Sequence, residues 1–345
     1  MRLDTTDECC NLQSVLHSLL VTSVVSSANR TRFRWVANAA ALTAWSARSG
    51  VPVSFLLVSF DHQSSSWADA QAESGHVLHV VDPTPLEHRF HPKQYLQYMY
   101  VKRLAMESRA RYMWSLDEDL ELRAEGHEFQ IDRFFERFAC GFPEGPPLIA
   151  QPLISPGTQA FHVFNYHEFL RRVGKAQMPF ITEVIYVEYQ APLVDARFWL
   201  FLMDVIGDTI AALEDSYRTD WGMDAVWCGA ARHYAASRLA GQAMSRRACA
   251  VVPIPLRHHS SNTIAHSAQL VNGGYAIRNW VSHNLVPFLR ARGEHVNHTW
   301  ENDWWVFREY KVQSSPTARK NLYHRLLSNN SSRYELARTP CHLSV

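Results

Sequence analysis

The chain has 345 residues, of which 47% are hydrophobic and 19% are charged. It is therefore long enough to bury a sizeable core, and global disorder is excluded. Lys and Arg number 34 and Asp and Glu number 33, and the resulting net charge of +1 gives no electrostatic reason to expect a nucleic-acid partner. No run of about 18 apolar residues occurs, so we expect no membrane span in this chain.

Strand-like apolar runs alternate with helical patterns along the first half of the chain. We predict strands at 19–27, 51–61, 76–82 and 111–116, a short helix within 64–75, and longer helices at 29–50 and about 93–107. The 29–50 helix is expected to stop at Gly50, because glycine readily adopts the left-handed conformation that ends a helix. The run at 111–116 leads directly into the acidic sequence DEDLEL.

The second half continues the alternation. We predict strands at 146–155, at 181–194 and from 249 to a pair of histidines, and helices at 196–214 and within 219–235. Apolar strands that alternate with amphipathic helices are typical of a mostly parallel sheet with helices on both faces. In such sheets ligands bind beyond the carboxyl ends of the strands. Asp61, Asp82 and the Asp117–Asp119 cluster fall at predicted strand ends, which predicts a polar site at one rim.

The Asp117-Glu118-Asp119 cluster carries the main chemical signal. In an extended chain, side chains two residues apart point to the same side. Asp117 and Asp119 can therefore share one hard divalent cation, Mn²⁺ or Mg²⁺. Such a cation can bridge the phosphates of a nucleotide diphosphate and neutralise the leaving group. The structural alternative is a solvated acidic turn.

Histidine and aspartate residues in the second half each have a functional and a structural interpretation. His258, which is followed by His259 at the end of a predicted strand, is either a third metal ligand or a structural histidine. Asp220 and Asp224 bracket WGM at a predicted helix start. Each is either an N-cap or a general base that takes a proton from an acceptor hydroxyl.

Three further residues are candidates for the site. Glu188 lies within the apolar run IYVEYQAPL, so its carboxylate should either pair with Arg or Lys or face the site. Lys102 and Arg103 either bind phosphates or belong to a solvated helix face.

Cysteines and glycosylation sequons bear on the compartment. None of the six cysteines belongs to a CxxC pair, which argues against a zinc site. The acidic start MRLDTTDECC does not resemble a secretory signal. It favours the cytoplasm unless an upstream anchor is missing. Sequons, which favour the secretory lumen, occur at Asn29, Asn297, Asn329 and Asn330.

Several blocks, taken in order, resemble the eukaryotic domain of unknown function 707 family, whose plant members are named lysine-ketoglutarate reductase trans-splicing related. The blocks are FLLVSFD with Trp67 soon after, YMYVKRL, SLDEDLEL, AQPLIS, YVEYQAP, WGMD with Cys228 downstream, and VVPIPLRH. Their order and spacing hold over about residues 19–265. Two positions depart from the family pattern: Pro253 replaces an Asp in the last block, and Leu116 replaces the Trp before the acidic cluster.

This family is similar to nucleotide-diphospho-sugar glycosyltransferases of the GT-A fold. The resemblance therefore implies a GT-A-like three-layer α/β/α sandwich with a mostly parallel central sheet. It implies an N-terminal extension (1–18), a glycosyltransferase domain (19–265) and a helical and irregular C-terminal tail (266–345). Within the domain, a nucleotide and metal half (about 19–145) precedes an acceptor half (about 146–265).

The resemblance also implies roles for individual residues. Asp117 and Asp119 become metal ligands, and His258 becomes the third ligand. Asp61 would lie near the nucleotide base or ribose, and Asp224 would face the acceptor. Two more residues, for which the resemblance implies no role, fall in family blocks: Glu188 and Gln151.

The expected activity is metal-dependent transfer of a sugar from a nucleotide-diphosphate donor to a glycan or other hydroxyl acceptor, in the Golgi lumen. Asp224 would act as the base in an inverting reaction, or position the acceptor in a retaining one. A metal-dependent nucleotidyltransferase is one alternative, although no glycine-rich or Lys/Arg-rich phosphate loop is visible near the N-terminus. The other is a non-catalytic protein that binds carbohydrate or nucleotide, or serves as a scaffold.

Overall fold

The computed structural model describes nine stretches of the chain, namely residues 11–74, 78–82, 96–124, 127–142, 145–156, 180–184, 187–217, 227–238 and 247–259. Asp220, Asp224 and the predicted tail at 266–345 lie outside these ranges. Within them, no helix combines the length and the apolar character that crossing a bilayer requires.

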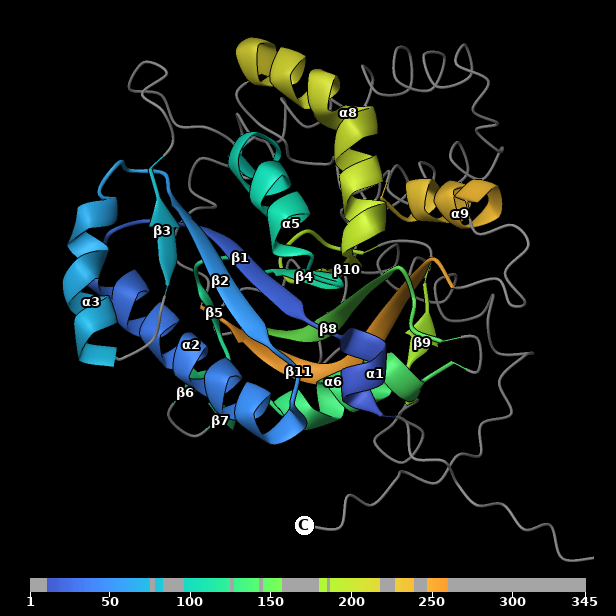
Figure 1. Ribbon diagram of the computed structural model, residues 1–345, viewed down its shortest axis with the longest axis horizontal. Coiled ribbons are helices and arrows are strands. Elements are labelled where there is room, and N and C mark those ends of the chain that lie inside the picture. Colours follow the sequence, from blue (N-terminus) through green and yellow to red (C-terminus); the bar gives the residue numbers. More distant parts are fainter. Residues whose placement is uncertain are drawn as a thin grey trace, which may run out of the picture.

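A nine-stranded sheet forms the centre of the described structure (Figure 1). In spatial order its main path is β3 (His79–Val81), β2 (Val53–Ser59), β1 (Leu19–Val25), β4 (Tyr112–Ser115), β10 (Leu193–Asp195), β8 (Ile149–Pro156), β11 (Cys249–His258) and β5 (Leu120–Glu121). The ninth strand, β9 (Thr182–Glu183), pairs with β11. Strands β1 to β4, β8 and β11 run in one direction, and β5, β9 and β10 run opposite to them. The carboxyl ends of β4 and β11 therefore meet at the same edge.

Helices cover both faces of this sheet (Figure 1). On one face lie α1 (Leu12–Leu16), α2 (Asn29–Ser49), α3 (Trp67–Ser74), which follows η1 (Ser64–Ser66), and α6 (Ile131–Cys140). On the other face lie η2 (Gln97–Val101), α5 (Lys102–Ser108), α8 (Ala196–Tyr217) and α9 (Trp227–Arg238). A separate hairpin joins β6 (Arg123–Ala124) to β7 (His127–Glu128). The predicted three-layer α/β/α architecture with a mostly parallel sheet is confirmed.

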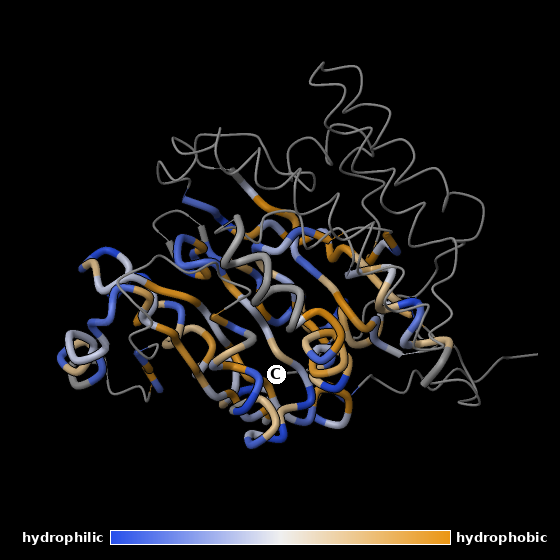
Figure 2. The backbone as a smooth tube through the Cα atoms, turned by 90° about the horizontal axis from the view of Figure 1, so that it is seen from above, coloured by the Kyte–Doolittle hydropathy of each residue, from blue (hydrophilic) through white to orange (hydrophobic). Residues whose placement is uncertain are grey.

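Each face of the sheet has its own hydrophobic core. Even-numbered residues of β1, such as Leu20, pack against the α5, α8 and α9 side, and odd-numbered residues, such as Val21, pack against the α2 and α6 side. Figure 2 shows hydrophobic residues along the central strands and hydrophilic ones toward the loops. Burial on both faces explains why these strands read as continuous apolar runs in the sequence.

Local sequence signals fix the ends of the two long helices. Gly50 ends α2 in the left-handed conformation with φ 70°, as predicted, and its N–H donates to the Ser46 carbonyl. Asp195 begins α8, because its Oδ1 accepts from the N–H groups of Arg197 at 3.0 Å and Phe198 at 3.4 Å.

The prediction of one long strand at 181–194 is wrong. The segment instead contributes two short strands, β9 and β10, which pair with different neighbours, β11 and both β4 and β8. The chain turns at Tyr189 and Gln190 between them. The apolar pattern of this segment shows that its residues are buried against the core. It does not show that they form one continuous strand.

The two predicted halves share this sheet. Strands β1 to β4 come from the first half, and β8, β10 and β11 come from the second and lie beside β4. Part of the predicted N-terminal extension also packs on the core, since Leu16 of α1 is fully buried.

Aromatic packing holds β4 in place below the acidic cluster. The Trp114 ring stacks on Phe134 of α6 with centroids 5.2 Å apart and an interplanar angle of 13°. Its indole N–H donates to the Ala191 carbonyl at 3.1 Å. Trp114 thus joins β4 to α6 and to the start of β10, three residues before Asp117.

Candidate metal and ligand site

The acidic loop that follows β4 is fixed by main-chain hydrogen bonds. The Leu116 N–H donates to the Thr22 carbonyl at 2.9 Å, and the Asp117 N–H donates to the Gln190 carbonyl at 2.9 Å. The Leu120 N–H then closes a turn onto the Asp117 carbonyl at 3.2 Å. The direction in which the chain leaves the sheet is therefore set by β1 and by the turn before β10.

Strand β11 brings His258 to the same loop. His258 lies opposite Leu120 in the antiparallel pairing of β11 with β5, and the His259 N–H donates to the Asp119 carbonyl at 2.9 Å. One potential ligand atom from each of Asp117, Asp119 and His258 lies within 4.8 Å of the other two. The structure thus brings together the three residues that the sequence suggested as metal ligands.

The surroundings of these three residues suit a divalent cation. Two carboxylates and an imidazole are donors that Mn²⁺ accepts, and Mg²⁺ prefers the carboxylate oxygens. His258 Nε2 lies 3.3 Å from Asp119 Oδ1. Burial alone would lower the pKa of His258, but its contact with Asp119 and the charges of Asp119, Asp117 and Glu188 raise that pKa above the usual value. The same negative potential that raises the pKa of His258 attracts a metal ion.

Glu118, the middle residue of the acidic cluster, binds Ser26 and does not belong to the group of possible metal ligands. Its Oε2 accepts hydrogen bonds from the N–H and the hydroxyl of Ser26, both at 2.8 Å. Burial raises the pKa of Glu118, and the charges of Asp119 and Asp117 add to this rise, which exceeds the lowering by the Ser26 hydrogen bonds. Glu118 therefore fastens the loop to the end of β1.

Helix α2 holds the far side of the acidic loop through two buried polar residues. The Arg34 Nη1 donates to the Glu118 carbonyl at 2.8 Å, and its Nε lies 3.2 Å from Glu121 Oε1. One turn further on, Asn38 Nδ2 donates to the Leu120 carbonyl at 2.9 Å, and Asn38 Oδ1 accepts from the Leu122 N–H at 2.8 Å. These two residues fix the main chain on both sides of Asp119.

Glu121 connects α2 to the second histidine. His259 Nε2 lies 2.5 Å from Glu121 Oε2, while Arg34 occupies the other carboxylate oxygen. Burial raises the pKa of Glu121, but the contacts with His259 and Arg34 outweigh it, so the pKa lies below the usual value. Glu121 is therefore held as a carboxylate beside the three possible metal ligands, Asp117, Asp119 and His258.

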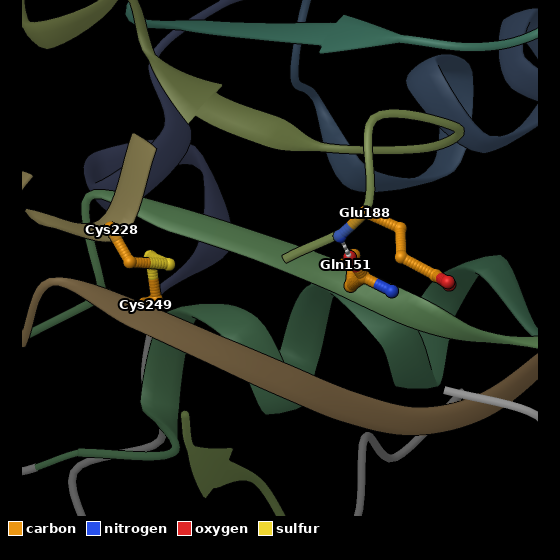
Figure 3. Close-up of a disulfide and its surroundings, with 4 residues drawn as sticks. All are labelled: Gln151, Glu188, Cys228 and Cys249. Carbon is orange, nitrogen blue, oxygen red and sulfur yellow. Dashed lines mark hydrogen bonds between the residues drawn. A yellow bond between two sulfur atoms is a disulfide. The ribbon is translucent and has the colours of Figure 1, made fainter. Parts of the chain in front are cut away.

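Glu188 lies on the side of the sheet that carries Gln151 (Figure 3). Its main-chain N–H donates to Gln151 Oε1, and both residues are buried. The charge of Glu188 contributes to the raised pKa of His258. Of the two interpretations open from the sequence, this electrostatic link favours a carboxylate that faces the site.

Gln97, for which no sequence signal indicated a role, joins the two segments that flank Asp117. It is fully buried in η2, its Nε2 donates to Ser115 Oγ at 2.6 Å, and its Oε1 accepts from the Tyr189 hydroxyl at 2.8 Å. The η2 segment is a π-helix, a deviation that is frequent at functional sites. Gln97 thereby ties the end of β4 to the turn that receives the Asp117 N–H.

Asp61 and Asp82 end β2 and β3 at the same edge, as predicted, and both bind serine residues. Asp61 Oδ2 accepts from the Ser27 N–H at 2.7 Å, and its Oδ1 accepts from the Ser59 hydroxyl at 2.8 Å. Burial raises the pKa of Asp61, but the hydrogen bonds from Ser27 and Ser59 outweigh it and lower the pKa overall. Asp82 accepts from the Ser64 N–H at 2.8 Å.

The two predicted phosphate-binding residues on α5 make ion pairs with other partners. Lys102 Nζ lies 2.5 Å from Asp204 Oδ1 of α8. Arg103 Nε lies 2.8 Å from Glu107 Oε1, one turn along the same exposed face of α5. Their contact with phosphate stays a prediction, as do the roles of Asp220 and Asp224.

A disulfide between Cys228 and Cys249 joins the start of α9 to the start of β11 (Figure 3). Both residues are fully buried, and Cys140 is also disulfide-bonded. These bonds could not be predicted from the sequence, because cysteine pairing depends on which segments meet in space. The cross-link anchors the end of β11 opposite to His258.

Fold and side chains together define a class of protein: an α/β domain with a candidate divalent-cation site at the carboxyl edge of its sheet. No protein-family model and no curated protein sequence matches the chain. Among solved structures, a match is the crystal structure of mannosyl-3-phosphoglycerate synthase from Rubrobacter xylanophilus. The two are 10% identical, the match covers 83% of this chain and 79% of that chain, and the TM-score is 0.40. The case for an activity therefore rests on the residues of this chain.

Proposed function

We propose that this chain is a metal-dependent glycosyltransferase that transfers a sugar from a nucleotide-diphosphate donor to a glycan or other hydroxyl acceptor. The observation that supports this most is the convergence of Asp117, Asp119 and His258 within 4.8 Å at the carboxyl edge of the sheet. Ligands of open α/β sheets bind at this edge. The ordered sequence blocks that resemble the domain of unknown function 707 family support the same activity.

In this proposal Asp117, Asp119 and His258 hold Mn²⁺ or Mg²⁺. The bound ion supplies positive charge that stabilises the departing diphosphate. Glu118 and Glu121 keep the acidic loop in place through Ser26 and Arg34.

Three further acidic residues have roles in the proposal. Asp61, at the neighbouring strand end, would contact the nucleotide base or ribose. Asp224 would take the proton of the acceptor hydroxyl if the reaction inverts the anomeric centre, and would position the acceptor if it does not. Asp220 is a second candidate for this acidic role.

Metal binding is the first test. Isothermal titration with Mn²⁺ should detect uptake by the wild type, and Asp117→Asn should weaken it by at least about 100-fold, because loss of even an outer-shell partner costs up to about that much. Asp132→Asn is the matched control, since Asp132 lies on α6 in an exposed ion pair with Arg48. Equal Mn²⁺ binding by both variants would remove the basis of the proposal.

Product analysis is the second test. We expect Mn²⁺-dependent consumption of one member of a panel of UDP-, GDP- and CMP-sugars, with a free nucleotide diphosphate as product from the first two. Transfer of a nucleotide monophosphate to an acceptor would instead identify a nucleotidyltransferase. Binding of metal and nucleotide without turnover of any donor would identify a non-catalytic binding protein.

For the compartment we propose the secretory lumen. The Cys228–Cys249 bond and the disulfide-bonded state of Cys140 support this, because disulfides persist in oxidising compartments and are rare in the cytosol. Microscopy of the full-length protein in its native cell should show it in the Golgi. A uniform cytosolic distribution would contradict the proposal.

A further inference from the structure

Helix α2 carries a row of three polar residues on the face that meets the acidic loop. Arg30, Arg34 and Asn38 are spaced four residues apart and therefore lie one above another. Arg34 and Asn38 are buried and bind the main chain of the loop. Arg30, in the first turn, is exposed. The outermost member of the row thus reaches solvent at the rim of the candidate metal site.

Arg30 contacts His259, a residue next to the group of possible metal ligands. Arg30 Nη2 lies 3.3 Å from His259 Nδ1, and His259 is also the residue whose N–H binds the Asp119 carbonyl. Its neighbour in the chain is His258. Through His259, Arg30 is therefore connected to Asp119 and His258, two of the three possible metal ligands.

This contact also defines the role of one nitrogen of the His259 ring. A guanidinium has five N–H donors and no acceptor, so His259 Nδ1 must accept the hydrogen bond from Arg30. The other ring nitrogen, Nε2, lies 2.5 Å from Glu121 Oε2. Glu121, His259 and Arg30 form a chain of contacts that ends in an exposed cationic side chain.

Arg30 keeps donors available for a ligand. Within the part of the chain that the structure describes, its contact with His259 is its one polar contact. The nearby cationic side chains have protein partners. Arg34 binds Glu121 and the Glu118 carbonyl. Arg32 binds the Ser66 carbonyl and Asn29.

We propose that Arg30 binds the phosphate oxygens of the donor diphosphate beside the metal ion. A diphosphate brings more negative charge than one divalent ion neutralises, and the loop already carries several carboxylates. A guanidinium matches phosphate geometry with two parallel N–H donors. This inference rests on the proposed function and adds a residue to its donor site.

The test compares nucleotide binding by wild type, two Arg30 variants and one control variant in saturating Mn²⁺, with UDP and GDP as probes in isothermal titration. Arg30→Ala should bind the preferred nucleotide about 10- to 100-fold more weakly than wild type, which is the usual effect of losing hydrogen bonds to a charged group. Arg30→Lys should fall between the two, because it keeps the charge without the paired donors.

Arg48→Ala is the matched control. Arg48 lies in the last turn of the same helix, about 27 Å away by helix rise, and is exposed in an ion pair with Asp132. It removes the same charge but should leave nucleotide affinity unchanged. Because Arg30 is exposed, melting temperatures of both variants should equal that of the wild type.

Two further outcomes separate this inference from the proposed function. The loss caused by Arg30→Ala should shrink from UDP to UMP and vanish for uridine; a loss that persists for uridine would overturn the assignment to phosphate. If wild type binds Mn²⁺ and nucleotide but Arg30→Ala behaves like Arg48→Ala, the role of Arg30 is overturned while the proposed function stands. If wild type binds no nucleotide with Mn²⁺, the proposed function itself fails.

Discussion

Asn38 gives a sharp test of how α2 holds the acidic loop. Its amide is fully buried and makes two hydrogen bonds, one to the Leu120 carbonyl at 2.9 Å and one from the Leu122 N–H at 2.8 Å. Replacement by leucine, which has a similar size, removes both partners without opening a large cavity. Each buried group left without a partner costs about 1–3 kcal/mol. We therefore expect Asn38→Leu to lower the free energy of unfolding by about 2–6 kcal/mol.

Urea unfolding followed by tryptophan fluorescence measures this change, provided that the denaturant slope stays the same in both proteins. The control is Thr43→Ala, an exposed position on the same helix, for which a change within about 0.5 kcal/mol is expected. An Asn38→Leu protein as stable as the control would refute the reasoning, since the two hydrogen bonds would then contribute nothing.

The remaining predictions concern acid stability and covalent cross-linking. The pKa of Asp61 is lowered from 3.8 in the folded state, so its stabilising effect is full above about pH 3.8 and is lost as pH falls through the folded-state pKa. Asp61→Asn should therefore be less stable than wild type at pH 7, and the gap in unfolding free energy should close in acid; a constant gap would contradict this. Replacing both Cys228 and Cys249 by alanine should lower stability by about 3 kcal/mol, because the bond closes a loop with a sequence separation of 21; an unchanged urea midpoint would contradict this.

Much of the architecture could be predicted because it follows from burial on both faces of the sheet. The runs at β1, β2 and β11 are mostly apolar and largely buried, and Gly50 marks the end of α2 by its own conformational preference. The proximity of Asp117 and Asp119 to His258 could also be predicted, since residues at the carboxyl ends of parallel strands lie at the same edge of the sheet.

Other parts could not be predicted because they depend on contacts between distant segments. Arg34 and Asn38 look like ordinary polar residues of a helix until β5 is placed against them. Their spacing of four residues, with Arg30, was the one available signal. The prediction of one strand at 181–194 failed because the residues of this segment are buried by neighbours on several sides. Such burial produces the same apolar pattern as a strand.

Complete burial of Cys228 and Cys249 has a consequence for how the protein must be prepared. Once the core has closed, an oxidant cannot reach either sulfur, so the bond has to form while the chain is still open. Material made in a reducing bacterial cytoplasm would be a different covalent molecule from that made in a eukaryotic secretory host. An inactive bacterial sample would therefore say nothing about the chemistry of the acidic edge.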